Sequence, residues 1–248
     1  MTNKIILEIR AGVGGEEAAI FAGNLTRMYQ KYSAKQNWKF TIVDFNQTSL
    51  DGYKTLIAEI ENPLTVSEQN LYEILKNESG VHRIQRIPKT EKSGRVHTST
   101  ASVAILPEIE QKEIQINPGD LEISFFRASG PGGQNVNKVE TAVRIVHKAS
   151  GIIAASQAGR SQYANREQAM NVLRAKLFEK KQLEEQSTLS SLRRDQIGTA
   201  ERAEKIRTYN FPQDRITDHR LNKSWHNIEK IMNGDLDPII KAFQNPQA

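Results

Sequence analysis

Cysteine is absent from this 248-residue sequence, and so is any long run of apolar residues. Without cysteine the chain has no disulfide, no thiolate ligand for zinc or an iron–sulfur cluster, and no thiol nucleophile. No segment approaches the roughly 18 consecutive apolar residues that cross a bilayer. The opening residues, MTNKIILEIR, lack both the apolar core of a secretory signal and the pattern of a transit peptide. We therefore expect a cytoplasmic protein with no membrane partner.

The motifs of self-sufficient hydrolases are missing as well. Neither Gly-x-Ser-x-Gly nor His-Glu-x-x-His occurs, and no two of the five histidines are four residues apart. The sequence thus contains neither a serine-hydrolase nucleophile in its usual setting nor a paired-histidine metal motif. We expect no cofactor, no metal and no autonomous enzyme.

The excess of positive charge is confined to the middle of the chain. The whole sequence has 34 Lys and Arg against 29 Asp and Glu, a net charge of +5. Residues 118–215 hold 16 basic and 11 acidic side chains, whereas 1–117 hold 14 of each and 216–248 hold four of each. A basic segment favours a polyanionic partner, most commonly nucleic acid. The alternative is a solvated helical surface.

Hydrophobic spacing predicts a mixture of strands and helices. The expected strands lie at 5–11, 38–45, 82–87, 99–106, 113–116, 123–127, 142–147 and 152–156. The expected helices lie at 16–36, 53–61, 71–77, 164–192 and 221–233. Asn117-Pro118-Gly119 is a boundary signal, and the small and charged residues of 196–205 predict a hinge.

Residues 127–137, RASGPGGQNVN, predict a loop with an unusual chemical role. Three glycines around one proline cannot hold a regular element, and they let another molecule approach the backbone closely. The loop contains no acid and no Ser–His pair. If it assists a hydrolysis, it must do so by positioning and by backbone hydrogen bonding. The alternative is a flexible connector.

Four strings in this order resemble those of class I peptide chain release factors, bacterial type 1: EIRAGVGGEEAA at 8–19, GVHRIQRIPKTEKSGRVHTST at 80–100, GPGGQNVN at 130–137 and IRTYNFPQDRITDHR at 206–220. The resemblance implies an α+β fold in which a codon-reading α/β-sandwich superdomain is built from two chain segments, with an inserted small α+β domain carrying the Gly-Gly-Gln loop and a long helix. It places the codon-recognition domain at 1–117, the Gly-Gly-Gln domain at 118–205 with its hinge at 196–205, and a C-terminal segment at 206–248 that packs on the codon-recognition domain. The family's amino-terminal helical domain is expected to be lacking.

The resemblance also implies the catalytic loop. Gly132, Gly133 and Gln134 would enter the ribosomal peptidyl transferase centre and promote hydrolysis of peptidyl-tRNA by water. A backbone N–H at Gln134 can stabilise the developing oxyanion or the leaving 3′-oxygen. The family precedent implies N5-methylation of Gln134 by a glutamine methyltransferase. Such a protein hydrolyses the ester only together with the ribosome.

Stop-codon recognition is implied for a second set of residues. Pro88-Lys89-Thr90 matches the family's Pro-x-Thr motif for UAA and UAG, where type 2 factors carry Ser-Pro-Phe. By resemblance Thr90 faces the second base, and its hydroxyl can accept a hydrogen bond from an adenine amine. The family places His97 between the second and third bases, where its ring can stack. Gln85 and Thr98 align with positions that contact the third base.

The Gly-rich turn before the helix at 16–36 is implied to read the first base. Strand, glycine turn and helix are also typical of a phosphate-binding loop, but Glu16 and Glu17 would repel a phosphate. Free backbone N–H groups at the helix start can donate to uracil carbonyls, and Glu17 can accept the uracil N3–H. The family assigns this role to Gly14 and Glu17. The alternative is that the acidic residues merely complement the helix dipole.

The remaining implications concern the hinge and the partners. Segment 196–205 aligns with the family's switch loop, represented by Gly198, Thr199 and Arg202, and the Gly-Gly-Gln domain would swing away after codon reading. The expected partners of this monomer are the ribosome (16S and 23S rRNA), an mRNA stop codon, peptidyl-tRNA and the methyltransferase. The alternatives are a stop-codon-independent rescue factor, which generally relies on a basic tail, and a plain RNA-binding module. Residues 216–248 are neutral by count.

Overall fold

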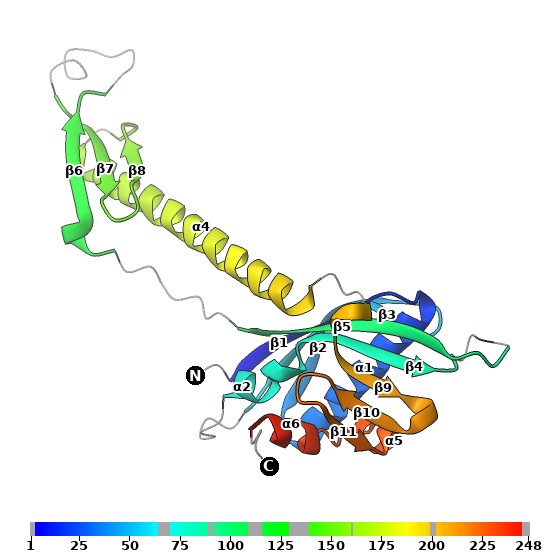
Figure 1. Ribbon diagram of the computed structural model, residues 1–248. Coiled ribbons are helices and arrows are strands. Elements are labelled where there is room, and N and C mark those ends of the chain that lie inside the picture. The colour runs from blue at the N-terminus through cyan, green and yellow to red at the C-terminus, as the bar shows by residue number, and fades with distance from the viewer. Residues whose placement is uncertain are drawn as a thin grey trace. The chain divides into compact units, whose positions relative to one another are not determined.

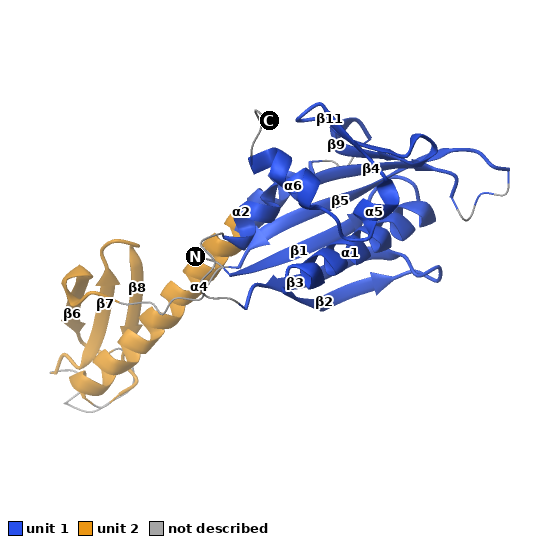
Figure 2. Ribbon diagram, turned by 90° about the horizontal axis from the view of Figure 1, so that it is seen from below, with its two compact units in different colours: residues 1–108, 189–248 blue, residues 109–188 orange. Residues whose placement is uncertain are grey.

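The computed structural model describes residues 3–63, 70–88, 91, 93–108, 116–128, 139–159, 161–198 and 202–244. The chain divides into two compact units, shown in two colours in Figure 2. Unit 1 consists of residues 1–108 and 189–248, and unit 2 of residues 109–188. The expected domain boundaries lie after 117 and after 205, while the units divide after 108 and 188. The second difference arises because the last turns of the long helix contact unit 1.

Unit 1 is built on one eight-stranded sheet in the order β11-β10-β9-β4-β5-β1-β3-β2 (Figure 1). Its strands are β1 Lys4–Ala11, β2 Lys39–Gln47, β3 Tyr53–Glu61, β4 Gly80–Arg86, β5 His97–Pro107, β9 Lys205–Asn210, β10 Arg215–Asp218 and β11 Lys223–His226. The β4–β9 pair is parallel, and it joins the two chain segments of the unit at the middle of the sheet. The other pairs are antiparallel.

Helix α1, Glu16–Lys35, packs on one face of this sheet. Its apolar side chains recur three and four residues apart, so they form one continuous stripe. Phe21, Leu25 and Met28 are fully buried in the same core as Ile5 and Leu7 of β1. The shorter helices of the unit are α2 Leu71–Leu75, α5 Ile228–Met232 and α6 Asp237–Gln244, with 3-10 turns η1 Lys76–Glu78, η3 Arg202–Glu204 and η4 Phe211–Gln213.

The prediction of a helix at 53–61 is wrong, since this segment is β3. The strand lies between β1 and β2 and pairs with both. Leu56, Ala58 and Ile60 are buried, which is an alternation of period two. Leu56, Ile57 and Ile60 also fit a helical spacing, and the two neighbouring strands decide between the two interpretations.

The prediction of one helix at 221–233 is also wrong in its first half. Lys223–His226 forms β11, which pairs with β10. Asn227 then adopts a left-handed conformation (φ 66°), and its side chain accepts a hydrogen bond from the Lys230 N–H at the start of α5. The short helix α6 was not expected from the sequence.

Unit 2 contains a three-stranded antiparallel sheet, β6-β7-β8. Its elements are the 3-10 turn η2 Pro118–Asp120, the strands β6 Leu121–Phe126, β7 Ala142–His147 and β8 Ile152–Ser156, and helix α4 Gln162–Ile197, whose residues from 189 onward belong to unit 1. Val143, Ile145 and Ala154 of the sheet pack against Leu173 and Leu177 of α4. The strands at 123–127, 142–147 and 152–156 are confirmed, and the helix at 164–192 is longer than expected.

The strands expected at 5–11, 38–45, 82–87 and 99–106 are confirmed as β1, β2, β4 and β5, and the helix at 16–36 as α1. Most of the expected strand at 113–116 lies outside the described residues. The fold is therefore of the expected mixed α and β class, with one large sheet. Within the described ranges, no helix has the length and apolar character needed to cross a membrane.

Candidate nucleic-acid interface

The β4–β5 hairpin brings together three of the residues expected to contact bases. Its register sets Gln85 opposite Thr98 and Arg86 opposite His97. Because directly opposed residues of an antiparallel pair share one face, Gln85 and Thr98 lie side by side. The His97 side chain is 47% exposed, so its ring is open to a ligand. Pro88 is buried just beyond β4, whereas Lys89 and Thr90 lie outside the described residues.

The loop after β4 holds His97 through a carboxylate. Glu91 Oε2 lies 2.6 Å from His97 Nε2, and Glu91 Oε1 accepts a hydrogen bond of 2.7 Å from the Ser93 N–H. The Glu91 N–H in turn donates to the Pro88 carbonyl at 3.1 Å. The Ser93 N–H and the contact with His97 hold the pKa of Glu91 below its ordinary value. Glu91 was not among the residues expected from the sequence.

The Gly-rich turn at the start of α1 is tied to β5. The Val13 N–H donates to Thr100 Oγ1 at 2.8 Å, and backbone bonds join Gly12 and Val13 to Thr100 at 2.9 and 2.8 Å. Gly14 has φ +135°, and a Cβ there would lie 2.6 Å from Ser99 Cβ. The turn therefore requires glycine at 14, both for its backbone conformation and for its close approach to β5.

Helix α1 starts with free backbone donors. In the described part of the chain no side chain caps its first turn, whose N-cap residue is Gly15. The exposed N–H groups of a helix start can donate to carbonyl or phosphate oxygens, with support from the helix dipole. The tip of α1 therefore offers hydrogen-bond donors beside the hairpin residues.

Glu17 is placed differently from a freely exposed acceptor. It is 4% exposed, and its Oε1 accepts a hydrogen bond of 2.6 Å from Arg86 Nε. Glu17 Oε2 is buried and has no hydrogen-bond partner among the described residues. The Arg86 guanidinium also lies over the Phe211 ring, 5.6 Å from its centroid. Arg86 thus joins α1 to the hairpin, a role that no local pattern in the sequence indicated.

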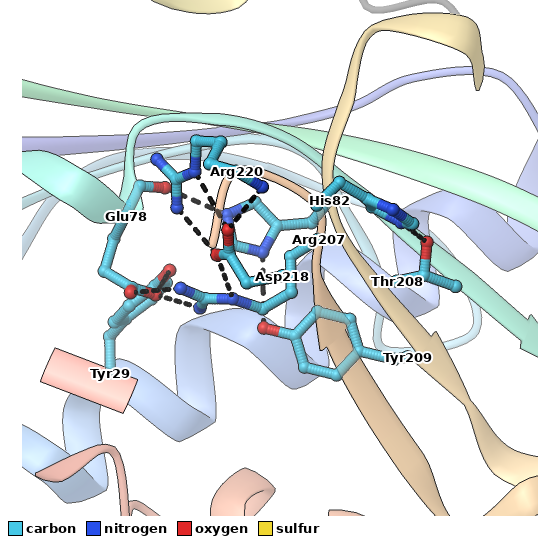
Figure 3. Close-up of polar contacts among 9 residues, drawn as sticks. Tyr29, Glu78, His82, Arg207, Thr208, Tyr209, Asp218 and Arg220 are labelled. Atoms are coloured by element: carbon cyan, nitrogen blue, oxygen red, sulfur yellow. Dashed lines mark hydrogen bonds and ion pairs between the residues drawn. The ribbon is translucent and has the colours of Figure 1, made fainter. Parts of the chain in front are cut away.

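A buried polar cluster joins η1 and β4 to β9 and β10 (Figure 3). Arg207 is completely buried and makes two hydrogen bonds to Glu78, of 2.6 and 2.7 Å, and one of 3.2 Å to Asp218. Burial alone would raise the pKa of Glu78, but the charge and hydrogen bonds of Arg207 hold that pKa below its ordinary value. The cluster thus contains paired charges rather than isolated ones.

His82 completes this cluster from β4. Its Nδ1 lies 3.2 Å from the Tyr209 hydroxyl and its Nε2 lies 2.9 Å from the Glu78 carbonyl oxygen. Burial, together with the charge of Arg207, lowers the pKa of His82 to about 4. The ring is therefore neutral at physiological pH, and its two hydrogen bonds help to set the position of β4, the strand that carries Gln85 and Arg86.

The expected switch segment is described on both sides of a gap. The Gly198 N–H donates to the Arg194 carbonyl at 2.9 Å and ends α4. Just before it, the Gln196 side chain bonds to both the N–H and the carbonyl of Ile105, at 3.0 and 2.9 Å. Arg193 pairs with the buried Glu8. Arg202 opens the 3-10 turn η3, while Thr199 lies outside the described residues.

The structure brings together Gln85, Pro88, His97, Thr98, Gly14 and Glu17 on unit 1. Gly132, Gly133 and Gln134 lie outside the described residues. Among the residues that are described, no group of three or more His, Asp and Glu side chains could hold a metal ion. Proteins bind unpaired RNA by stacking bases on rings and by forming hydrogen bonds to base edges. The exposed His97 ring, the amide and hydroxyl groups of Gln85 and Thr98, and the backbone donors at the start of α1 are groups of these kinds.

Two family models match the chain, the PCRF domain over residues 2–103 and the RF-1 domain over residues 108–220. Its curated relatives include proteins named "Peptide chain release factor 1". That of Carboxydothermus hydrogenoformans is 52% identical over 96% of this chain and 65% of the relative. That of Dictyoglomus thermophilum is 55% identical over 95% and 63%, and that of Thermotoga maritima is 51% identical over 98% and 69%.

Among solved structures, RF2 of Thermus thermophilus matches with a TM-score of 0.58 and 34% sequence identity. The match covers 99% of this chain and 68% of that one. The chain spans about two thirds of the length of the curated relatives it matches. These names and domains do not support the rescue-factor alternative.

Proposed function

The chain belongs to the family of peptide chain release factors, and we propose that it ends translation by reading UAA and UAG in the ribosomal A site. It then promotes hydrolysis of peptidyl-tRNA in the peptidyl transferase centre. The observation that carries the proposal is the grouping on unit 1 of Gln85, His97 and Thr98 beside the Gly14 turn. Its partners are the ribosome with its 16S and 23S rRNA, the stop codon and peptidyl-tRNA.

Unit 1 is the codon-reading domain in this proposal. The free N–H groups at the tip of α1, with Gly14 and Glu17, recognise the uracil of the first position. The Glu17 oxygen that lacks a partner in the described chain is buried, so the Glu17 side chain must move before this oxygen can accept the uracil N3–H. Thr90, in the selectivity motif Pro88-Lys89-Thr90, faces the second base.

The β4–β5 hairpin completes the reading of the codon. The exposed ring of His97 stacks between the second and third bases. Gln85 and Thr98, which lie side by side across the hairpin, contact the third base, where A and G are both accepted. Amide and hydroxyl groups suit this tolerance because each can both donate and accept.

The inserted α+β domain, which includes unit 2, carries the Gly-Gly-Gln loop in this proposal. Gly132 and Gly133 permit close approach to the ester, and the backbone N–H of Gln134 stabilises the oxyanion. The Gln134 side chain shapes a pocket that admits water and rejects larger nucleophiles. Because the loop has no nucleophile or base of its own, hydrolysis depends on the ribosome. A glutamine methyltransferase modifies Gln134, and the monomeric factor works in the cytoplasm.

The switch loop with Gly198, Thr199 and Arg202 couples the two events. Its first part is fixed to unit 1 by the bonds of Gln196 to Ile105 and by the Arg193–Glu8 pair. Release of these contacts after correct codon reading would let the Gly-Gly-Gln domain change its direction. The coupling therefore predicts that Gln196→Ala alters the rate of release more than codon binding.

The deciding experiment is a peptide-release assay on ribosomes programmed with UAA, UAG, UGA or an empty A site. We expect release at UAA and UAG alone. Equal release on an empty A site would contradict codon reading, and hydrolysis of free peptidyl-tRNA would contradict ribosome dependence. Gly133→Ala should abolish release and leave binding to stop-codon complexes nearly unchanged. If binding fell equally, the division of roles between the two regions would be wrong.

A further inference from the structure

We propose that Glu91 is a positioning residue that fixes the ring of His97, through His97 Nε2, for stacking on a codon base. This inference rests on the proposed function, in which His97 lies between the second and third bases. Its structural basis is the 2.6 Å contact between Glu91 Oε2 and His97 Nε2. The contact joins a largely buried carboxylate to an exposed ring, since the Glu91 side chain is 8% exposed and that of His97 47%.

The contact determines where the ring carries its proton. An ionised carboxylate only accepts hydrogen bonds, so a hydrogen must reside on His97 Nε2. In the neutral ring, Nδ1 is then the nitrogen without a hydrogen. The hydrogen bond also restricts rotation of the ring about its side-chain torsions. Glu91 therefore sets both the tautomer and the plane of the aromatic surface that is offered to a base.

Glu91 is itself held in place by the backbone. Its second oxygen accepts the Ser93 N–H at 2.7 Å, and its own N–H donates to the Pro88 carbonyl at 3.1 Å. The Ser93 bond and the His97 contact keep the pKa of Glu91 below its ordinary value, so the carboxylate is ionised at neutral pH. A side chain fixed at both ends of its carboxylate can orient a partner, whereas a mobile surface acid cannot.

An alternative role for Glu91 is a surface ion pair with Arg95. The Arg95–Glu91 distance is 3.7 Å and the Arg95 side chain is 74% exposed. Such exposed pairs contribute little because water and salt screen them. The contact with His97 is more than 1 Å shorter. Arg95→Gln therefore serves as a matched control for the loss of charge pairing in this loop.

The first test is spectroscopic and does not depend on the ribosome. In Glu91→Gln the Ser93 N–H still donates to the side-chain oxygen, so the amide NH₂ group faces His97. Because this group donates, it favours the tautomer in which Nε2 has no hydrogen and Nδ1 carries it. We expect ¹⁵N shifts of His97, assigned with His97→Asn, to show the hydrogen on Nε2 in the wild type and on Nδ1 in the variant. An unchanged tautomer in Glu91→Gln would overturn the proposal.

The second test separates binding from catalysis in the release assay at UAA and UAG. Freeing one side chain at an interface weakens binding about 3- to 10-fold. We expect Glu91→Gln to raise the half-saturating concentration of the factor by about this factor, with the maximal rate unchanged. Glu73→Gln, which removes an exposed acid paired with Lys76 elsewhere on unit 1, should have no effect. A fall in the maximal rate alone would overturn the proposal.

A double-mutant cycle identifies the partner. If Glu91 acts through His97, Glu91→Gln should add nothing in the His97→Asn background. Full additivity, or an equal effect of Arg95→Gln, would overturn the proposal. Failure of the wild-type protein to release peptide at any stop codon would instead contradict the proposed function, and the NMR result would still decide whether Glu91 fixes the ring.

Discussion

Helix α1 of unit 1 and the part of α4 in unit 2 differ sharply in how much they bury. Twelve of the 20 residues of α1 are buried, and they cover a wide stripe against the sheet. Helix α4 has 36 residues and buries four of them, Asn165, Ala169, Leu173 and Leu177, which recur every four residues. Because hydrophobic stabilisation grows with the apolar area removed from water, α1 has far more of it per residue.

The two units therefore differ in how they are stabilised. The core of unit 1 joins residues from both of its chain segments and includes a buried, fully paired arginine. Among the described residues of unit 2, the core cluster contains six buried residues, Val143, Ile145, Ala154, Ala169, Leu173 and Leu177. Small cores leave little margin of stability. We expect unit 1 to be the more stable one, with unit 2 opening at lower denaturant concentration.

The largest expected effect comes from Arg207→Met. Removing the guanidinium leaves the buried Glu78 without its charged partner, while Asp218 keeps its ion pair with Arg220. Breaking a buried pair in this way costs about 3–5 kcal/mol. Both tryptophans of the chain, Trp38 and Trp225, lie in unit 1, so their fluorescence during urea unfolding reports on this unit alone. Hydrogen exchange in β7 should stay as in the wild type. Equal loss of protection in β7 would show that the two units unfold together.

Leu173→Ala should destabilise unit 2 and leave the stability of unit 1 unchanged. Leu173 is fully buried in the small core of unit 2, and such truncations cost about 2–5 kcal/mol. We expect faster amide exchange in β7 and β8, with an unchanged tryptophan transition. Val172→Ala is the matched control, because Val172 is 42% exposed on the same helix turn. If both variants behaved alike, the small core would not be what holds unit 2.

Gly14→Ala tests the turn beside the hairpin. The added Cβ would meet Ser99 Cβ at 2.6 Å in a backbone conformation with φ +135°, and overpacking of this kind costs about 1–3 kcal/mol. We expect weaker binding to stop-codon complexes and a modestly lower urea midpoint of the tryptophan fluorescence transition. The neighbouring Gly15 also has a positive φ, of 60°, but nothing lies within 4 Å of its Cβ position, so Gly15→Ala tests the backbone strain without the clash. A loss of binding in Gly15→Ala as large as that in Gly14→Ala would contradict the role of the Ser99 contact.

Unit 1 is also expected to show a pH dependence of stability. Burial lowers the pKa of His82 to about 4, below the ordinary value near 6.5, so the unfolded chain takes up the proton first as the pH falls. Stability is therefore complete above about pH 6.5 and decreases by about 1.4 kcal/mol per pH unit towards pH 4. Urea unfolding at pH 7, 6 and 5 measures this slope.

Two variants identify the group responsible. His82→Asn should reduce the slope but not remove it, because burial also lowers the pKa of His219. His226→Gln should leave the slope unchanged, since His226 is exposed. A slope that survived in His82→Asn at full size would show that another group controls it.

Local patterns predicted most of the elements, and their failures have a common cause. The stripe of α1 and the alternation of β1 are short-range features, so the sequence displays them directly. Tyr53–Glu61 and Lys223–His226 became strands because β1, β2 and β10 supply their hydrogen-bond partners. Strand formation depends on such partners more than helix formation does. The motifs at 8–19 and 80–100 likewise located the candidate site before any fold was known.

The amino-acid sequence by itself determined the family, the class of fold and the segments that carry Gly14, His97 and Gln134, because motifs and spacing are written along the chain. Only the tertiary structure decided that Arg86 pairs with Glu17, that Glu91 contacts His97, and that Arg207 of β9 pairs with Glu78 of η1. Charge pairing depends on distance and burial in three dimensions. Residues 69 or 129 positions apart become partners only when the sheet has brought them together.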